Sequence, residues 1–282
     1  MWKLSPRQSR LAYSALWYAG GAVLTAITLF PFFWMILTSF KGMPEIIVKQ
    51  PIWIPQHPTL DNYWYAFETV KWYRYFENSI IVAFFVTSIS VLVSTFGGYA
   101  LSRFEFPGKN TFSIWLLVVY MMPASFMAFP LYIIFSRMGL TNTYISVILA
   151  QMTLILPFTI WMLKGYFGSI STDLEEAGMV DGCTRPMAVL RIVLPIALPG
   201  LAASAAFAFI ESWQNYLYAL VMISNDELRT LPLGAASFMG WAGLQWGKIM
   251  AYSVMTVLPA IVFFGFLQRY LIQGLTAGAV KE

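Results

Sequence analysis

The chain has 282 residues, of which 59% are hydrophobic and only 11% are charged. Soluble domains carry about 25% charged residues, so this composition indicates a membrane protein rather than a soluble one. The net charge of +4 is explained by cations that flank apolar runs, which leaves little support for nucleic-acid binding. The lone cysteine, Cys183, excludes an internal disulfide and a multi-cysteine metal site.

Six apolar runs are long enough to cross a bilayer, because a hydrocarbon core of about 30 Å needs about 20 helical residues. We therefore predict a single all-α transmembrane domain over residues 1–282. Its expected spans lie at about residues 12–39, 78–102, 111–136, 140–163, 196–223 and 249–270. Prolines inside these runs, such as Pro123 and Pro157, predict kinked helices.

Orientation is predicted from the Lys and Arg residues that lie near the ends of the spans. With six spans the two termini share one side, which holds ten of these cations against seven on the other. The bias places both termini in the cytoplasm. The lone histidine, His57, then falls in the first outer loop, where we expect an exposed loop residue.

A polar stretch at residues 171–194, the acidic hairpin, interrupts the apolar runs on the side of the termini. Thr172 followed by Glu175 fits a capping box, which predicts the start of a short helix. Gly182 is placed to end that helix in a left-handed conformation, and Pro186 suits the first turn of a second helix. The pattern predicts a helix, a glycine turn and a second helix.

The first helix of this hairpin carries acidic side chains, at Asp173, Glu175, Glu176 and Asp181. One interpretation is an amphipathic connector that lies on the membrane surface. Surface helices usually carry Lys and Arg, however, and an anionic leaflet repels carboxylates. The acidic face therefore favours a protein partner with basic groups.

The spacing within the hairpin resembles the EAA motif of the membrane subunits of ABC importers, written E-A-A-x3-G-x9-I-x-L-P. The matching residues are Glu176, Ala177, Gly178, Gly182, Ile192, Val193, Leu194 and Pro195. Gly178 replaces the second alanine, which we expect to loosen the helix by up to about 1 kcal/mol. Four further segments resemble the carbohydrate-uptake branch of that family, the MalG-like permeases: residues 78–83, 98–103, 212–216 and 274–281.

The resemblance implies an ABC importer permease with a MetI/MalG-like fold, a multi-pass protein of the bacterial inner membrane. It also implies a second permease subunit, a cytoplasmic ATPase dimer, an external solute-binding protein and a sugar substrate. The residues implied to couple to the ATPase are Glu175, Glu176, Ala177, Gly178, Asp181 and Gly182. The chain has no ATP-binding G-x-x-x-x-G-K-[ST] loop, so ATP and Mg²⁺ are expected on the partner ATPase and no cofactor or catalytic residue on this chain.

Glu211 is the one ionisable residue well inside an expected span, and such residues usually face the bundle interior. Four polar side chains fall on one face of the expected fifth helix at spacings of three and four: Glu211, Gln214, Asn215 and Tyr218. Together with Gln151 they are candidates for lining a sugar path. Alternatively, they join helices or contact the sister subunit.

Two further segments carry expectations from the same resemblance. The tail at residues 274–282 either reaches the ATPase interface or is a solvated chain end. In the outer loop at residues 225–248, Trp241, Gln245 and Trp246 either contact a solute-binding protein or belong to an aromatic belt at the membrane interface.

Other functional classes remain as alternatives. An importer of glycerol phosphate or a polyol is the nearest one, because the same branch includes such proteins. A secondary carrier would also suit Glu211 and the kinked helices. A membrane enzyme is disfavoured because the single histidine and the single cysteine are far apart in sequence and on opposite predicted sides.

Overall fold

The computed structural model describes residues 6–240 and 243–279, and their secondary structure is almost entirely helical. The chain divides into two compact units, which are described separately. The first consists of Met1–Val70 with Phe238–Met255, and the second of Lys71–Ser237 with Thr256–Glu282. The sequence analysis expected one domain, and helix α13 (Trp246–Ala279) belongs partly to each unit.

The first unit begins with the long helix α1, followed by short elements and a small hairpin. Its helices are α1 (Pro6–Ser39), α2 (Met43–Ile46), α3 (Asp61–Trp64) and the π-helical turn η1 (Tyr65–Thr69). The hairpin pairs β1 (Met239–Gly240) antiparallel to β2 (Gly243–Leu244), with Met239 opposite Leu244. The start of α13 completes this unit.

Lys41 fastens the loop that follows α1 in this first unit. Its side chain is buried, its Nζ donates to the carbonyl of Ile52, and it lies 4.3 Å from the ring centroid of Trp34. Burial lowers the pKa of Lys41 below its usual value, and nearby Glu45 partly opposes that shift. Glu45 itself accepts the backbone N–H groups of Gln56 and His57. The Pro-rich loop is thus tied down by two charged side chains.

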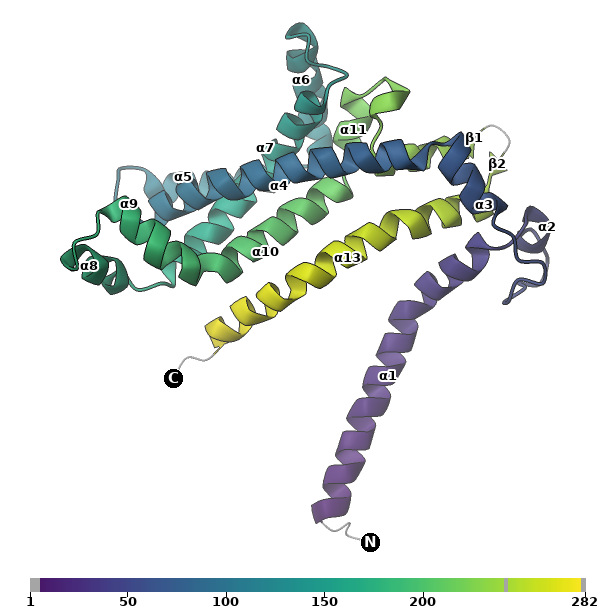
Figure 1. Cartoon of the computed structure of the whole chain (residues 1–282), viewed down its shortest axis with the longest axis horizontal. Helices are drawn as coiled ribbons and strands as arrows, with labels where there is room; N and C mark the ends of the chain where they lie inside the picture. Colours follow the sequence, from purple (N-terminus) through teal and green to yellow (C-terminus); the bar gives the residue numbers. More distant parts are fainter. Residues whose placement is uncertain (1–5, 241–242, 280–282) are drawn as a thin grey trace. The chain divides into compact units, whose positions relative to one another are not determined.

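The second unit is a helical bundle (Figure 1). Its long helices are α4 (Trp72–Arg103), α7 (Tyr144–Gly168), α10 (Leu194–Trp213) and the remainder of α13. The shorter ones are α5 (Lys109–Tyr120), α6 (Ala124–Arg137), α8 (Asp173–Val180), α9 (Arg185–Ala188), the π-helical turn η2 (Val189–Val193) and α11 (Leu217–Met222). The 3₁₀ turn η3 (Asp226–Leu228), α12 (Leu231–Ala235) and the 3₁₀ turn η4 (Ala236–Phe238) lead back toward the first unit.

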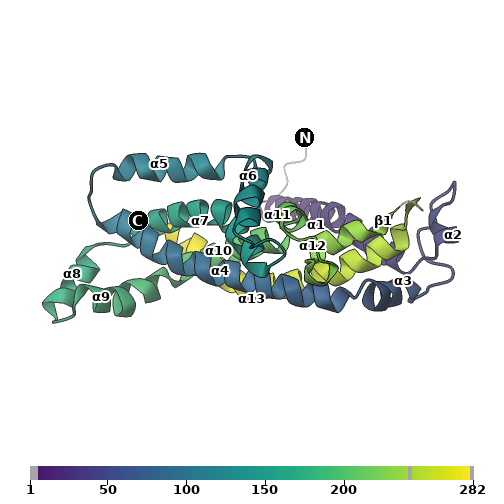
Figure 2. The same cartoon turned by 90° about the horizontal axis from the view of Figure 1, so that it is seen from above.

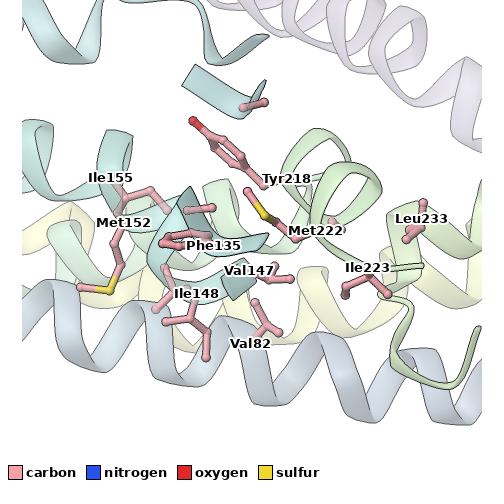
Figure 3. Close-up of a cluster of buried hydrophobic side chains, with 14 of the residues drawn as sticks. Val82, Phe135, Val147, Ile148, Met152, Ile155, Tyr218, Met222, Ile223 and Leu233 are labelled. Atoms are coloured by element: carbon pink, nitrogen blue, oxygen red, sulfur yellow. The ribbon is translucent and has the colours of Figure 1, made fainter. Parts of the chain in front are cut away.

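Helices α4, α7 and α10 pack against one another, with α5 against α7, as Figure 2 shows from above. Small residues permit the close approach that membrane helices need. A methyl group built on Gly98 would overlap Leu163 of α7, and Ser94 Oγ lies 2.5 Å from Thr159 Oγ1. An apolar cluster joins α4, α6, α7 and α11 around Val82, Val147 and Met222 (Figure 3).

Within residues 6–240 and 243–279, five helices are long and apolar enough to cross a membrane, or up to six if a bent pair counts as one span. The expected third span, residues 111–136, is this pair, because α5 and α6 meet at an angle of 94°. Pro123 caps α6, and the residue before a proline disfavours the α conformation, so the helix stops and turns there. The expected fifth span, 196–223, also breaks, since α10 ends at Trp213.

Candidate functional site

The acidic hairpin has the predicted shape. Helix α8 ends in a Schellman motif, in which Cys183 N–H bonds to the carbonyl of Gly178 at 3.0 Å and Gly182 N–H to that of Met179 at 3.1 Å. Gly182 has a φ of +94°, as its position predicted. Pro186 lies in the first turn of α9, which runs on through η2 into α10. Main-chain bonds therefore close the turn.

The predicted capping box is wrong. The side chain of Thr172 makes no capping bond, and the N–H of Asp173 bonds instead to Ser171 Oγ at 3.2 Å. Glu175, the other half of the box, has turned toward the bundle. A charge-assisted hydrogen bond contributes about 1.5–3 kcal/mol, whereas an N-cap is worth about 1 kcal/mol. The carboxylate of Glu175 therefore bonds to the bundle rather than to the start of α8.

Glu175 joins α8 to the end of α4. Its Oε1 lies 2.5 Å from Arg103 Nε, and its Oε2 accepts a hydrogen bond from Tyr99 at 2.7 Å. The side chains of Arg103 and Glu175 are only 6% and 4% exposed. Arg103 also donates through Nη2 to the carbonyl of Ile170 at 2.9 Å. This buried network connects α4, the end of α7 and α8 through one carboxylate.

Gly178 has a packing role that the sequence analysis missed. It is buried in α8, and a methyl group built there would overlap Cδ1 of Ile192 in η2. The glycine was expected only to loosen the helix, as interior glycines do. Its lack of a side chain instead lets the two arms of the hairpin lie closer together. Position 178, which carries alanine in the EAA motif, is therefore glycine here because the side chain of Ile192 fills the space that a methyl group would take.

The remaining predicted coupling residues lie on the opposite, exposed face of α8 and its turn. Glu176, Ala177, Asp181 and Gly182 are all exposed. Val180 is 87% exposed, so an apolar side chain stands beside the carboxylates. Exposed acidic groups around a small residue and an apolar one can accept a basic partner surface at close range.

Sequence reasoning missed Tyr99 and Arg103 as parts of this site. The available signal was their spacing of four residues near the end of a span, which places both on one face of α4. An arginine at a helix C-terminus also reads as a favourable dipole partner, so the pattern did not demand a carboxylate. Nothing in the sequence indicated that Val180 would be exposed beside the carboxylates.

The candidate path residues do not form the expected stripe. Between α10 and α11 the chain leaves the helix at Gln214–Tyr216, and Asn215 Oδ1 accepts the N–H of Tyr218 at 3.1 Å. Gln214 remains beside Glu211, with Nε2 3.3 Å from Oε1. Tyr218 is 1% exposed and belongs to the apolar cluster beside Met222 (Figure 3), with its hydroxyl 3.5 Å from Thr153 Oγ1.

Gln151 is buried in α7 at 1% exposure, and neither its amide nitrogen nor its amide oxygen has a partner in the described part of the chain. A buried unpaired amide is costly, so it calls for a partner other than the described residues. Glu211 is half-buried and its side chain is available beside Gln214. These three residues remain candidates for polar contacts in an assembled transporter.

The two expected partner segments are described only in part. Trp241 lies outside the described residues, while Trp246 opens α13 and is 42% exposed. Gln245 has a buried side-chain oxygen with no partner among the residues that the structure describes. In the tail, the backbone of α13 continues as helix through Ala279, and residues 280–282 lie outside the description.

The fold and the acidic hairpin define a class of membrane transport protein. Residues 90–277 match the family described as binding-protein-dependent transport system inner membrane component. The chain belongs to this family. That match spans α4 from its middle, the acidic hairpin and most of α13, so the predicted membership in the family of ABC importer permeases is confirmed.

Relatives within the family include carbohydrate permeases. The chain is 36% identical to the diacetylchitobiose uptake system permease protein DasC of Streptomyces coelicolor, over 96% of this chain and 99% of that protein. It is also 36% identical to the trehalose/maltose transport system permease protein MalG of Thermococcus litoralis, over 93% and 95%. A chain of a bacterial ABC transporter that imports alginate has the same fold, with a TM-score of 0.78 at 19% identity over 96% and 99% of the two chains.

These matches confirm the predicted fold class, an all-α membrane protein of the ABC importer permease type. They also establish a multi-pass inner membrane protein, in agreement with its apolar helices. The chain is a transport subunit of an ABC importer.

Proposed function

We propose that this chain is the permease subunit of an ATP-driven sugar importer and acts on disaccharides or oligosaccharides. It pairs with a second permease subunit, docks on an ATPase dimer through α8 and receives its cargo from an external solute-binding protein. ATP and Mg²⁺ are bound by the partner ATPase. Both termini and the acidic hairpin face the cytoplasm, which the distribution of Lys and Arg supports.

The observation that carries the proposal is that α8 has one carboxylate buried in the bundle and the next one exposed. Glu175 is held inside the bundle by Arg103 and Tyr99, while Glu176 is exposed on the other face. A push on the exposed face is then transmitted to α4 through a buried ion pair rather than absorbed by a loose loop. Glu176 offers its carboxylate to an Arg or Lys of the ATPase, and Ala177 lets the two proteins approach closely.

The sugar cargo is supported by the relatives named above, which cover nearly the whole chain. Arabinooligosaccharides are named for another relative, AraQ of Halalkalibacterium halodurans, at 34% identity. The polyol alternative is supported by a relative at 34% identity, the sulfoquinovosyl glycerol transport system permease protein SmoH of Agrobacterium fabrum. A glycosylated glycerol is therefore the second candidate cargo.

The cargo is tested with the complex purified from its native membrane and reconstituted in vesicles. We expect an ATPase, a second permease and a solute-binding protein to accompany the chain. With a panel of sugars and glycosyl glycerols, a disaccharide or oligosaccharide should stimulate ATP hydrolysis and enter the vesicles. Purification of the chain without an ATPase would instead support a secondary carrier.

The docking role of α8 is tested with Glu176→Arg. Charge reversal on an exposed face should leave the chain folded but abolish ATPase binding and uptake, because two like charges then face each other. Glu68→Arg is the matched control, since Glu68 is exposed and lies outside the acidic hairpin. Wild-type uptake and ATP hydrolysis in the Glu176→Arg complex would show that the docking assignment is wrong.

A further inference from the structure

A long apolar cavity lies on the second unit between α4 and the helix that runs from α9 through η2 into α10. Its volume is about 870 Å³, within the range of ligand pockets. It is termed the inner groove here and is lined chiefly by Thr87, Val91 and Thr95 of α4 and by Val189, Leu201 and Ala205. Figure 1 shows α4 and α10 side by side, with α9 at one end.

The same faces of α4 and α10 are covered at their other end. Phe76 lies on the face of α4 that continues to Thr87, and its ring meets Trp213 of α10 with centroids 6.2 Å apart. Trp213 stacks on Phe209, whose ring in turn stacks on Phe263 of α13 with centroids 3.5 Å apart. An aromatic stack thus closes the outer part of the strip, and the inner groove is the part left open.

The α4 wall of the inner groove matches one leaflet of a bilayer in length, since it runs from Thr87 to Tyr99, roughly 18 Å at 1.5 Å per residue. The opposite wall runs from Ala205 to Arg185, roughly 30 Å, and so continues past Tyr99 toward α9, where a head group would lie. One leaflet contributes about 15 Å of hydrocarbon, whereas a transmembrane helix needs about 30 Å. A helix of a partner subunit would meet the aromatic stack, whereas an acyl chain would fit below it.

The end of the inner groove next to α9 carries a positive charge. Arg185 lines the groove, and its guanidinium carbon lies 5.3 Å from the ring centroid of Phe104, which also lines it. None of the ion pairs in residues 6–240 and 243–279 includes Arg185. Arg103, one residue before Phe104, is by contrast already neutralised by Glu175. An apolar channel therefore ends at an uncompensated cation.

We propose that the inner groove binds an anionic phospholipid of the leaflet on the side of the acidic hairpin. The acyl chain lies between α4 and α10, and the head-group phosphate pairs with Arg185. Basic pockets at the cytoplasmic ends of membrane helices commonly hold anionic lipids in this way. The lipid would brace α9 against α4 directly beside the Glu175 network, and no known substrate or nucleotide is involved.

The proposal is tested on the intact transporter in nanodiscs of phosphatidylglycerol or phosphatidylcholine, with bound lipid counted by native mass spectrometry after detergent exchange. We expect phosphatidylglycerol to be retained by the wild type and its affinity to fall about tenfold in Arg185→Gln, because a charge-assisted bond is lost. Arg191→Gln is the matched control: Arg191 is exposed on η2 of the same hairpin arm and does not line the groove. It should retain the lipid like the wild type.

Four outcomes would overturn the proposal. The first is equal retention of the two lipids, and the second is equal retention by Arg185→Gln and the wild type. The third comes from Leu92→Cys, made with Cys183→Ser and carrying a photoreactive label, because Leu92 lines the inner groove. Cross-linking of the label to lipid is expected, whereas cross-linking to the second permease or to α13 would show that a helix fills the groove. Displacement of the lipid by inorganic phosphate alone would show that Arg185 binds only the free anion.

Discussion

The two faces of α8 carry carboxylates that are adjacent in sequence and opposite in surroundings. Glu175 is buried and is bonded to Arg103 and Tyr99, while Glu176 is exposed. The buried face, with Glu175 and Gly178, sets where the helix lies. The exposed face, with Glu176 and Ala177, is available to a partner. An acidic cluster in a sequence can therefore combine internal fastening with external recognition.

The largest expected effect comes from Glu175→Gln. This change leaves Arg103 as a buried charge without its partner, and breaking a buried ion pair costs about 3–5 kcal/mol. The free energy of unfolding, measured by denaturant titration in detergent micelles, should fall by about that amount. Glu176→Gln is the matched control and should change it by less than about 0.5 kcal/mol. Similar losses in the two variants would contradict the contrast between the faces.

Gly178→Ala tests the packing of the buried face. The added methyl group overlaps only Cδ1 of Ile192, the end of a side chain that can turn aside, so we expect a loss near the lower end of the usual overpacking cost of about 1–3 kcal/mol. Ile192→Val removes that carbon atom, so the double variant should recover much of the lost stability in a thermal melt. If Gly178→Ala alone stabilises the chain, helix propensity outweighs packing at this position.

Gly182→Ala tests the turn between the arms of the hairpin. With a φ of +94° the position favours glycine, and a side chain there costs about 1–2 kcal/mol. Nothing lies within 4 Å of a methyl group built at Gly182, so the loss should reflect backbone strain alone. A melting temperature equal to that of the wild type would show that the turn relaxes freely.

The smallest effect is expected for Thr172→Ala. Removing a working N-cap costs about 1 kcal/mol, but Thr172 makes no capping bond here. The free energy of unfolding should therefore change by less than about 0.5 kcal/mol. A loss near 1 kcal/mol would mean that a capping box forms in solution and that Glu175 leaves Arg103 for part of the time.

Local signals in the sequence predicted the hairpin well. The positive φ of Gly182 and the helical start at Pro186 follow from the conformational limits of single residues. The fate of Glu175 did not follow, because its partner Arg103 lies 72 residues away in sequence. A capping box is predicted from residues close in sequence alone, whereas Glu175 pairs with Arg103, which is distant in sequence.

The breaks in the expected spans show the same limit. The sequence predicted one span over residues 111–136, kinked at Pro123, and one over residues 196–223, but neither the 94° bend at Pro123 nor the break near Asn215. A proline does not by itself end a membrane helix, since Pro130 and Pro157 lie inside α6 and α7. Pro123 and Asn215 stand at the actual breaks, where Pro123 caps α6 and Asn215 holds the start of α11. Which polar or proline residue breaks a helix depends on the packing around it.

The Schellman turn at Gly182 also makes the shape of the hairpin independent of its exposed side chains. Its shape is held by main-chain bonds from Gly182 and Cys183, and its position by the buried Glu175. The side chains of Glu176, Ala177 and Val180 make neither the turn bonds nor the Glu175 network, so they can be substituted without changing the fold of the hairpin. On the docking proposed above, exchanging these three positions between transporters would re-pair a permease with a foreign ATPase.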